Sequence, residues 1–124
     1  MKNILIVDND LGFVYWLGSV LIGAKYQPWP ACSVSDAFTV VGQRPTIPLD
    51  LLVVNPSMEG VKDLISRYRR TQPNIKVIGV GPQNVRNLSN VAVWREKPSP
   101  YDDSDKRKWL RAIDRICGSH RRAV

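Results

Sequence analysis

The chain has 124 residues, of which 44% are hydrophobic and 23% charged, and its formal net charge is +7. This composition fits one ordinary globular domain with a single core, and it excludes a disordered, collagen-like or membrane-embedded chain. The charge is uneven: residues 105–124 carry seven basic and two acidic side chains, a net +5, so the first 104 residues carry only +2.

A strand and a helix are predicted first. Residues 3–7 are apolar and β-branched after Asn3, as a strand covered on both faces requires. The next segment repeats its apolar residues at three- and four-residue spacing, the period of a helix with one buried face, and Gly23 can close that helix. The positions expected on the buried face are Leu11, Val14, Tyr15, Gly18, Leu21 and Ile22.

The second unit starts with a strand that belongs at the edge of a sheet. Residues 26–32 alternate weakly, and Pro28 and Pro30 lack the backbone donors that a central strand needs. Ser33 is well placed as a helix cap, with Asp36 three residues later. The inward positions expected on this helix are Val34, Ala37, Phe38 and Val41.

Three further strands and two further helices complete the pattern. Residues 51–54, 75–80 and 91–94 are the strand candidates. One helix carries Val61, Leu64, Ile65 and Tyr68 on its apolar face and ends before Pro73. The last helix begins near Asp103 or Ser104, stops at Gly118, and turns Trp109, Leu110, Ile113, Ile116 and Cys117 inward. Strands alternating with helices indicate a doubly wound parallel α/β sheet, a single (βα)5 domain over residues 1–118 with a flexible basic tail at 119–124.

Several classes of site and location find no support in the residues. The apolar core of residues 3–7 is too short for a signal peptide, and no apolar run is long enough to cross a bilayer, so we expect a cytoplasmic protein without membrane contact. Cys32 and Cys117 lie far apart without metal-ligand spacing and are expected to be buried thiols. The only histidine, His120, lies in the tail, and no Gly-rich phosphate loop is present. We therefore expect no catalytic residue, no cofactor and no metal.

The chemistry-bearing residues follow the strands. In open parallel sheets, sites form where the carboxyl ends of the strands meet helix N-termini and loops. That edge is expected to present Asp8, Asn9 and Asp10 after the first strand, Asn55 after the third, Gly81 after the fourth and Lys97 after the fifth.

This edge resembles the receiver domain of bacterial two-component response regulators. The resemblance covers nearly the whole chain and rests on residues 4–10 (ILIVDND), 50–55 (DLLVVN) with 58–60 (MEG), and 94–98 (WREKP). It implies the flavodoxin-like strand order 2-1-3-4-5 and a role in two-component signal transduction or a phosphorelay. In the family, the first stretch supplies an acidic pair that holds Mg2+, the second ends in the aspartate that accepts phosphate, and the lysine of the third contacts the phosphoryl group.

The chain departs from the family pattern at its reactive positions. Asp8 and Lys97 match, whereas Asn9 and Asn55 do not, and an amide is neither a nucleophile nor a strong magnesium ligand. Gly81 replaces the family's Ser or Thr, whose hydroxyl moves toward the phosphoryl group. Trp94 takes the place of a Tyr or Phe that changes rotamer on activation, and we expect it to be a fixed packing residue. The short stretch from Gly81 to Lys97 implies a shortened fourth helix.

The expected function is that of a phosphorylation-independent pseudo-receiver. The pocket is expected to be vestigial, because Asp8 alone can satisfy Lys97 without a metal, although Asp8 and Asp10 suit a helix cap equally well. The domain would act as a protein–protein interaction module that binds a protein partner or a second copy of itself. One alternative remains a receiver switched through Asp8 or Asp10 as a substitute acceptor.

The second alternative is a basic nucleic-acid-binding domain that uses its last helix. The candidate interaction face consists of Lys106, Arg107, Lys108, Arg111 and Arg115. Charges in such a row are most often the solvated face of an amphipathic helix. No aromatic stacking platform or helix-turn-helix pair accompanies them, so nucleic acid is the weaker alternative.

Overall fold

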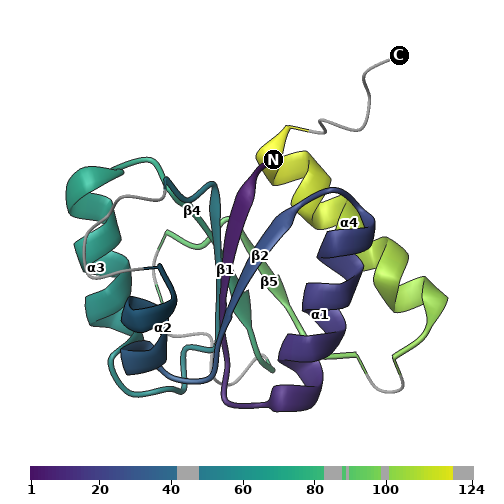
Figure 1. Ribbon diagram of the computed structural model, residues 1–124, viewed down its shortest axis with the longest axis horizontal. Helices are drawn as coiled ribbons and strands as arrows, with labels where there is room; N and C mark the ends of the chain where they lie inside the picture. The colour runs from purple at the N-terminus through teal and green to yellow at the C-terminus, as the bar shows by residue number, and fades with distance from the viewer. Residues whose placement is uncertain (42–47, 83–87, 89, 99–100, 119–124) are drawn as a thin grey trace.

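Five parallel strands form one sheet between two pairs of helices (Figure 1). The computed structural model describes residues 1–41, 48–82, 88, 90–98 and 101–118. The strand order β2-β1-β3-β4-β5 confirms the predicted α/β class and topology. In chain order the elements are β1 (Asn3–Val7), α1 (Leu11–Gly23), β2 (Gln27–Ala31), α2 (Val34–Val41), β3 (Leu51–Val54), α3 (Val61–Thr71), β4 (Lys76–Val80), β5 (Val93–Arg95) and α4 (Asp103–Cys117).

The core lies on both faces of the sheet. Helices α1 and α4 cover one face and α2 and α3 cover the other (Figure 1). Ile4 and Ile6 of β1 pack on the α1 and α4 side, whereas Leu5 and Val7 pack on the α2 and α3 side. Because both faces are covered, β1 and β3 read as continuous apolar runs rather than alternating ones. The apolar stripe of α3 is buried at all four predicted positions.

Strand register aligns the carboxyl ends of the central strands. Val7 pairs with Ala31 of β2 and with Val54 of β3. The backbone N–H of Asn55 donates to the carbonyl of Val7, so the residues that follow β1 and β3 leave the sheet side by side. Strand β2 pairs with β1 alone, which confirms the predicted edge position of its two prolines.

Helix ends follow the predicted residues in part. The Ser33 hydroxyl accepts the N–H of Asp36 at 2.9 Å, as predicted. Helix α4 begins at Asp103, as predicted, but its cap is Asp102, which the sequence did not single out and which accepts the N–H of Asp105 at 2.9 Å. Gly118 ends α4 at a φ of 70°. Gly23 is different: it is the last residue of α1, and the left-handed residue that follows the helix is Lys25, at a φ of 70°. Gly23 is therefore not required by the helix end.

The predicted buried face of α1 is wrong at three of its six positions. Leu11, Tyr15 and Ile22 are exposed by 53%, 69% and 64%. The buried residues are Phe13, Val14, Leu17, Gly18, Val20 and Leu21. The cause is composition: α1 contains no charged side chain, so three- and four-residue spacing fits more than one face of the helix. A stripe of apolar side chains remains in water as a result.

Cys32 is exposed, so the predicted buried thiol is wrong there, because the edge strand β2 ends just before it. Cys117 is half-buried, and burial raises the pKa of its thiol to about 11.

Two segments bear on the remaining predictions. The described residues between β4 and β5 contain no helix, and residues 83–87 and 89, where the shortened fourth helix was expected, lie outside the described part of the chain. The predicted tail at 119–124 lies outside it as well. In the described ranges, no helix is long and apolar enough to cross a bilayer.

Candidate functional site

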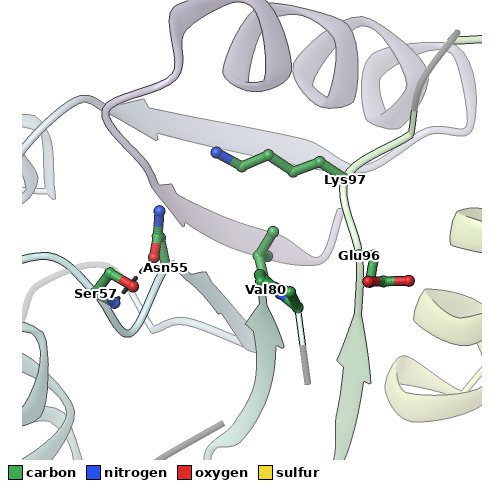
Figure 2. A pocket seen from close by; sticks show the side chains of 7 residues that line it. Asn55, Ser57, Val80, Glu96 and Lys97 are labelled. Carbon is green, nitrogen blue, oxygen red and sulfur yellow. Dashed lines mark hydrogen bonds between the residues drawn. The ribbon is translucent and has the colours of Figure 1, made fainter. Parts of the chain in front are cut away.

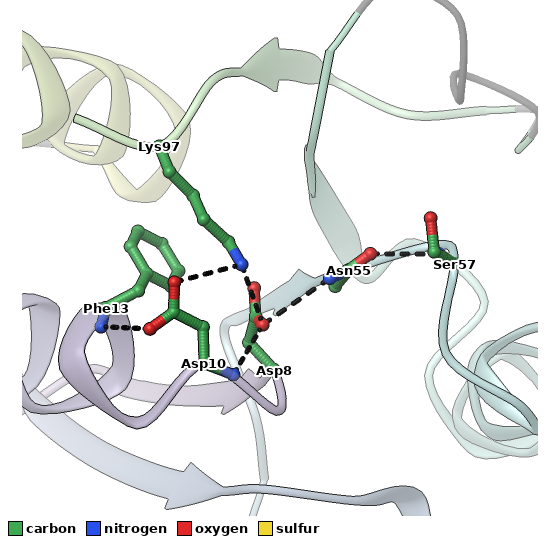
Figure 3. A network of polar contacts seen from close by, with 6 residues as sticks. All are labelled: Asp8, Asp10, Phe13, Asn55, Ser57 and Lys97. Atoms are coloured by element: carbon green, nitrogen blue, oxygen red, sulfur yellow. Dashed lines mark hydrogen bonds and ion pairs between the residues drawn. The ribbon is translucent and has the colours of Figure 1, made fainter. Parts of the chain in front are cut away.

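Four of the predicted side chains meet at the carboxyl edge of the sheet. Asp8 and Asp10 come from the loop after β1, Asn55 from the end of β3 and Lys97 from the segment after β5 (Figure 3). Asp8 lies at the centre and is only 1% exposed. A buried carboxylate is tolerated only where donors or cations surround it, so the contacts of Asp8 decide what the site can do.

One oxygen of Asp8 is saturated with donors. Its Oδ1 accepts the backbone N–H of Asp10 at 3.0 Å, the ammonium of Lys97 at 3.0 Å and, at a longer 3.4 Å, the amide nitrogen of Asn55. The Lys97 ammonium also lies 3.3 Å from Asp10 Oδ2. Lys97 thus bridges two carboxylates from the same loop, as the dashed lines in Figure 3 show.

Asp10 has two roles at once. Its Oδ1 caps α1 by accepting the N–H of Phe13 at 3.2 Å, while its Oδ2 pairs with Lys97. These contacts lower the pKa of Asp10, the hydrogen bond from Phe13 contributing most and Lys97 adding to it. The cap and the pocket, which the sequence left as two readings, therefore hold together in one residue.

The amide of Asn55 provides what a carboxylate could not. Its Oδ1 accepts the backbone N–H of Ser57 at 2.9 Å, which fixes the turn after β3, and its nitrogen points toward Asp8. An aspartate in the same pose would place a second anion about as close to Asp8 as the amide nitrogen is now. The amide gives a donor at that point and removes the repulsion.

The second oxygen of Asp8 has no donor. In the described part of the chain nothing hydrogen-bonds to the buried Oδ2. Two carboxylates and one ammonium leave the cluster with a formal charge of −1. Asn9 lies in the same loop, but its side chain is exposed and is not part of the network.

A pocket of about 450 Å3 opens beside the network (Figure 2). Val80 lies between Asn55 and Lys97 in this view, and the carboxylate of Glu96 points away from Asn55. Gly81 is buried at the pocket wall, donates its N–H to the carbonyl of Arg95 at 3.0 Å, and has a φ of 151°. The residues lining the pocket are Asn55, Ser57, Val80, Gly81, Pro82, Glu96 and Lys97.

Trp94 packs against the neighbouring strand. Trp94 and Gly79 are register partners in β5 and β4. A Cβ added to Gly79 would lie 2.4 Å from the Cζ3 atom of the indole, so the ring covers the space above the glycine. This close packing is consistent with the expectation of a fixed aromatic side chain.

The basic face of α4 is open to solvent. Lys106, Arg107, Lys108, Arg111 and Arg115 are all exposed, while Trp109 on the opposite side of the helix is buried against Phe13 and Trp16. The helix is therefore amphipathic as predicted.

The sequence did not predict Ser57, Val80, Pro82 and Glu96 of the pocket wall, and it missed two residues that hold Lys97 and Trp94 in place. The Lys97 ammonium lies 5.6 Å from the centroid of the Phe13 ring, a cation–π contact that holds it over the loop. The position of Phe13, three residues after the capping Asp10, was the available signal. Gly79 is the other missed residue, and a glycine inside a strand was itself a sign of close approach.

The architecture is similar to that of solved receiver domains. A response regulator receiver domain protein from Clostridium thermocellum gives a TM-score of 0.74 at 14% identity, with 95% of each chain covered. A CheY-like receiver domain protein from Methanospirillum hungatei JF-1 gives 0.71 at 20% identity, with 98% of each chain covered. The response regulator TrrA from Thermotoga maritima, solved in complex with Mg2+-BeF, gives 0.71 at 19% identity, covering 94% of this chain and 99% of that one.

These likenesses show that the chain has the receiver-domain fold. A scan of the sequence against protein-family models finds no match, and a search of curated proteins finds none either.

The donor set of the site does not fit the magnesium ion that this fold family implies. Three of the four carboxylate oxygens of Asp8 and Asp10 already accept hydrogen bonds or pair with Lys97. The fourth, Asp8 Oδ2, is buried and cannot be joined by the several waters that Mg2+ retains. The ammonium beside both carboxylates would also repel a divalent cation. Within the described ranges, no group of three His, Cys, Asp or Glu side chains could hold a metal.

Proposed function

We propose that this chain is a phosphorylation-independent receiver-like domain that works as a protein–protein interaction module in signal transduction and has no enzymatic activity. The observation that carries the proposal is the bridge from Lys97 to Asp8 and Asp10 beside the Asn55 amide. The chain's own ammonium supplies the positive charge at the centre of the site. Both carboxylates are thus paired with a cation in the absence of a metal or a phosphoryl group.

Phosphoryl chemistry needs a carboxylate that can reach a donor molecule. The amide of Asn55 has no nucleophilic oxygen for this step. Asp8 is buried: its Oδ1 would lose three donors on reacting, and its Oδ2, which has no donor, is closed off from solvent. Asp10 would lose the cap of α1 and its pair with Lys97. These costs weigh against the substitute-acceptor alternative.

A response to phosphorylation also needs an element with two states. A ligand shifts a conformational equilibrium only through contacts that differ between the states. Gly81 has no hydroxyl to follow a phosphoryl group, and Trp94 packs tightly over Gly79. The groups that would read a phosphorylated state are replaced, which favours a domain that presents one constant surface.

The nucleic-acid alternative has weaker support. Exposed basic residues on α4 fit a phosphate backbone and a solvated helix face equally well. The aromatic residue of α4, Trp109, is buried and offers no stacking surface. Binding to arbitrary duplex DNA that weakens steeply with salt, and that is lost when Lys106 and Arg107 are both changed to Glu, would favour that alternative.

The central test is a ligand challenge at the site. Millimolar Mg2+, with and without beryllofluoride, should leave the melting temperature and the amide NMR spectrum unchanged. Acetyl phosphate should leave the mass unchanged. A covalent adduct that disappears in Asp8→Ala or Asp10→Ala would contradict the proposal, as would a saturable rise in melting temperature with Mg2+.

A further inference from the structure

Helix α1 presents a charge-free face to water. Six of its residues are exposed: Leu11, Gly12, Tyr15, Ser19, Ile22 and Gly23, which we term the α1 stripe. At 100° per residue they fall within about a third of the helix circumference. Three large side chains of this stripe are more than half exposed, and α1 contains no charged residue on any face. An uncharged helix face of this kind is unusual on a chain with a net charge of +7.

The α1 stripe consists of two rows with opposite character. Leu11, Tyr15 and Ile22 form a row of large side chains, and Gly12, Ser19 and Gly23 form a parallel row of small residues. Both rows have their middle near residue 17. When two copies of α1 lie antiparallel about a two-fold axis at that point, each row meets the same row of the other copy in reverse order.

The resulting pairing is self-complementary. Leu11 of one copy meets Ile22 of the other in the large row. Gly12 meets Gly23 in the small row, where the two backbones can approach closely. Tyr15 and Ser19 lie near the axis. The pattern therefore suits a second copy of the same helix without any change of sequence.

Gly23 supports this arrangement independently. A glycine in a helix is less stable than an alanine at the same position. Among the described residues, a Cβ added to Gly23 would meet nothing within 4 Å, and the φ of Gly23 is not positive. Neither packing within this part of the chain nor the backbone therefore requires a glycine there. A backbone of a second copy packed against this position would require one.

The charge distribution favours a second copy over an acidic partner. Two chains of +7 repel one another, and they meet with least repulsion at a face that carries no charge. An acidic partner would instead be drawn to the exposed basic residues of α4, which lies beside α1 (Figure 1). The large row leaves on the order of 400 Å2 of apolar side chain in water, about half of the ~800 Å2 that each partner gives to a standard interface. The association should therefore be weak, with a dissociation constant on the order of 10 μM.

We propose that the chain forms a two-fold symmetric homodimer in which the α1 stripes of two copies pack antiparallel. The inference rests on the proposed function, since it names the partner of a domain whose interaction surface is constant. Phosphorylation is not needed for this dimer, because the α1 stripe lies outside the carboxylate network.

Sedimentation equilibrium of the whole chain tests the association. The wild-type chain should dimerise with a dissociation constant that falls as salt is raised, because salt screens the repulsion between copies. Tyr15→Glu should raise the constant at least tenfold, and Gly23→Ala should raise it several-fold while leaving the monomer as stable or more stable. Ser66→Glu, which adds the same charge on α3, should have no such effect.

Cysteine pairing tests the geometry. In a Cys32→Ser background, Leu11→Cys protein mixed with Ile22→Cys protein should form a disulfide-linked dimer. Neither variant alone should do so, since equivalent residues lie roughly 16 Å apart along the antiparallel pair. Crosslinking of single variants but not of the mixture would overturn the antiparallel pairing.

A wild-type chain that stays monomeric at concentrations on the order of 100 μM would overturn the homodimer, as would a dimer unaffected by Tyr15→Glu or weakened by salt. None of these results would touch the proposed function, because the Mg2+ and beryllofluoride test reports on the carboxylate network alone.

Discussion

The indole ring of Trp94 occupies the space in which Gly79, its partner on the neighbouring strand, would carry a side chain. A Cβ built at Gly79 lies 2.4 Å from Cζ3, 2.5 Å from Cε3 and 2.8 Å from Cη2 of the ring. Contacts this short cannot be relieved by a small rotation, because the ring lies directly over the strand. Either the indole or the strand must shift when the glycine is replaced.

Gly79→Ala is therefore expected to lower the free energy of unfolding by roughly 1–3 kcal/mol. The same substitution in a Trp94→Leu background should cost much less, since the clashing ring is gone. A double-mutant cycle measured by urea unfolding would give the coupling free energy between positions 79 and 94. Gly18→Ala is the matched control, because none of the residues that the structure describes lies within 4 Å of the added Cβ. Equal costs in both backgrounds would contradict the packing of Trp94.

Replacement of Lys97 by Met should be strongly destabilising. Asp8 is 1% exposed, and removing its cation leaves a buried charge with backbone and amide donors only. We expect a loss of roughly 3 kcal/mol in urea unfolding, and partial recovery in the double variant with Asp8→Asn. Lys2→Met provides the control: its pair with Asp50 is 3.9 Å long and both side chains are partly exposed, so it should cost less than about 1 kcal/mol. Similar losses of unfolding free energy for Lys97→Met and Lys2→Met would mean that the ion pair between Lys97 and Asp8 is solvated.

Asp10 should make stability depend on pH in the acid range. Its folded-state pKa is lowered from the usual value of about 3.9 by the Phe13 N–H and by Lys97. The contribution of its charge is therefore fully present above about pH 4 and is lost as the pH falls through the lowered pKa. The stability difference between the wild type and Asp10→Asn should shrink between about pH 6 and pH 2. In a Lys97→Met background, the change of this stability difference with pH should be smaller. A stability difference that grows as the pH falls would contradict a lowered pKa for Asp10.

Carboxylates at positions 9 and 55 should allow Mg2+ to bind and should lower the stability of the metal-free protein. Asn55→Asp places an anionic oxygen beside Asp8, since the Asn55 amide nitrogen now lies 3.4 Å from Oδ1, and Asn9→Asp adds an exposed carboxylate to the loop that carries Asp8. Without Mg2+ the double variant should be less stable than the wild type because the charges repel. With free Mg2+ at about ten times its dissociation constant, roughly 1.4 kcal/mol should be recovered. Thermal melts of both proteins, with and without Mg2+, make the comparison, and an unchanged melting temperature of the variant would show that these strand ends cannot form a metal site.

Strong local patterns made most of the fold predictable. The continuous apolar runs predict buried strands at β1 and β3, and the single apolar stripe predicts the buried face of α3. The parallel register of β1 and β3 then brings Asp8 and Asn55 to the same edge of the sheet. The cap at Ser33 follows from residue type and spacing alone. These features depend on neighbours in the sequence or on the topology, both of which a single chain reveals.

The remaining features depend on contacts between distant segments. Helix α1 has no charged residue on any face, so only packing against α4 and the sheet decides that Phe13 is buried and Tyr15 exposed. The reach of Lys97 to Asp10 as well as Asp8 depends on a flexible side chain. Strand β5 begins at Val93, two residues later than the apolar run indicated. Ala92 is the last residue of the preceding loop, and its N–H donates to the carbonyl of Val77.

A serine at position 81 should not recreate a switch. Gly81 has a φ of 151°, a region that residues with a Cβ rarely adopt. Gly81→Ser should therefore lower the free energy of unfolding by about 1–3 kcal/mol. Even combined with Asn9→Asp and Asn55→Asp, it should leave the NMR spectrum insensitive to beryllofluoride. Gly18→Ser, at an ordinary helical position, should cost less than Gly81→Ser, and a large beryllofluoride response of the triple variant would show that the backbone adapts.

The backbone at Gly81 makes a phosphorylation switch harder to build in this chain than a carboxylate at position 55. Asparagine and aspartate differ only in the exchange of an amide nitrogen for an oxygen, so one substitution supplies the carboxylate. A hydroxyl at position 81 gains nothing until the main chain has left its positive φ. Intermediates with a side chain at position 81 would be less stable without yet being regulated. A descendant of this chain would more readily evolve new surfaces than acquire a phosphorylation switch.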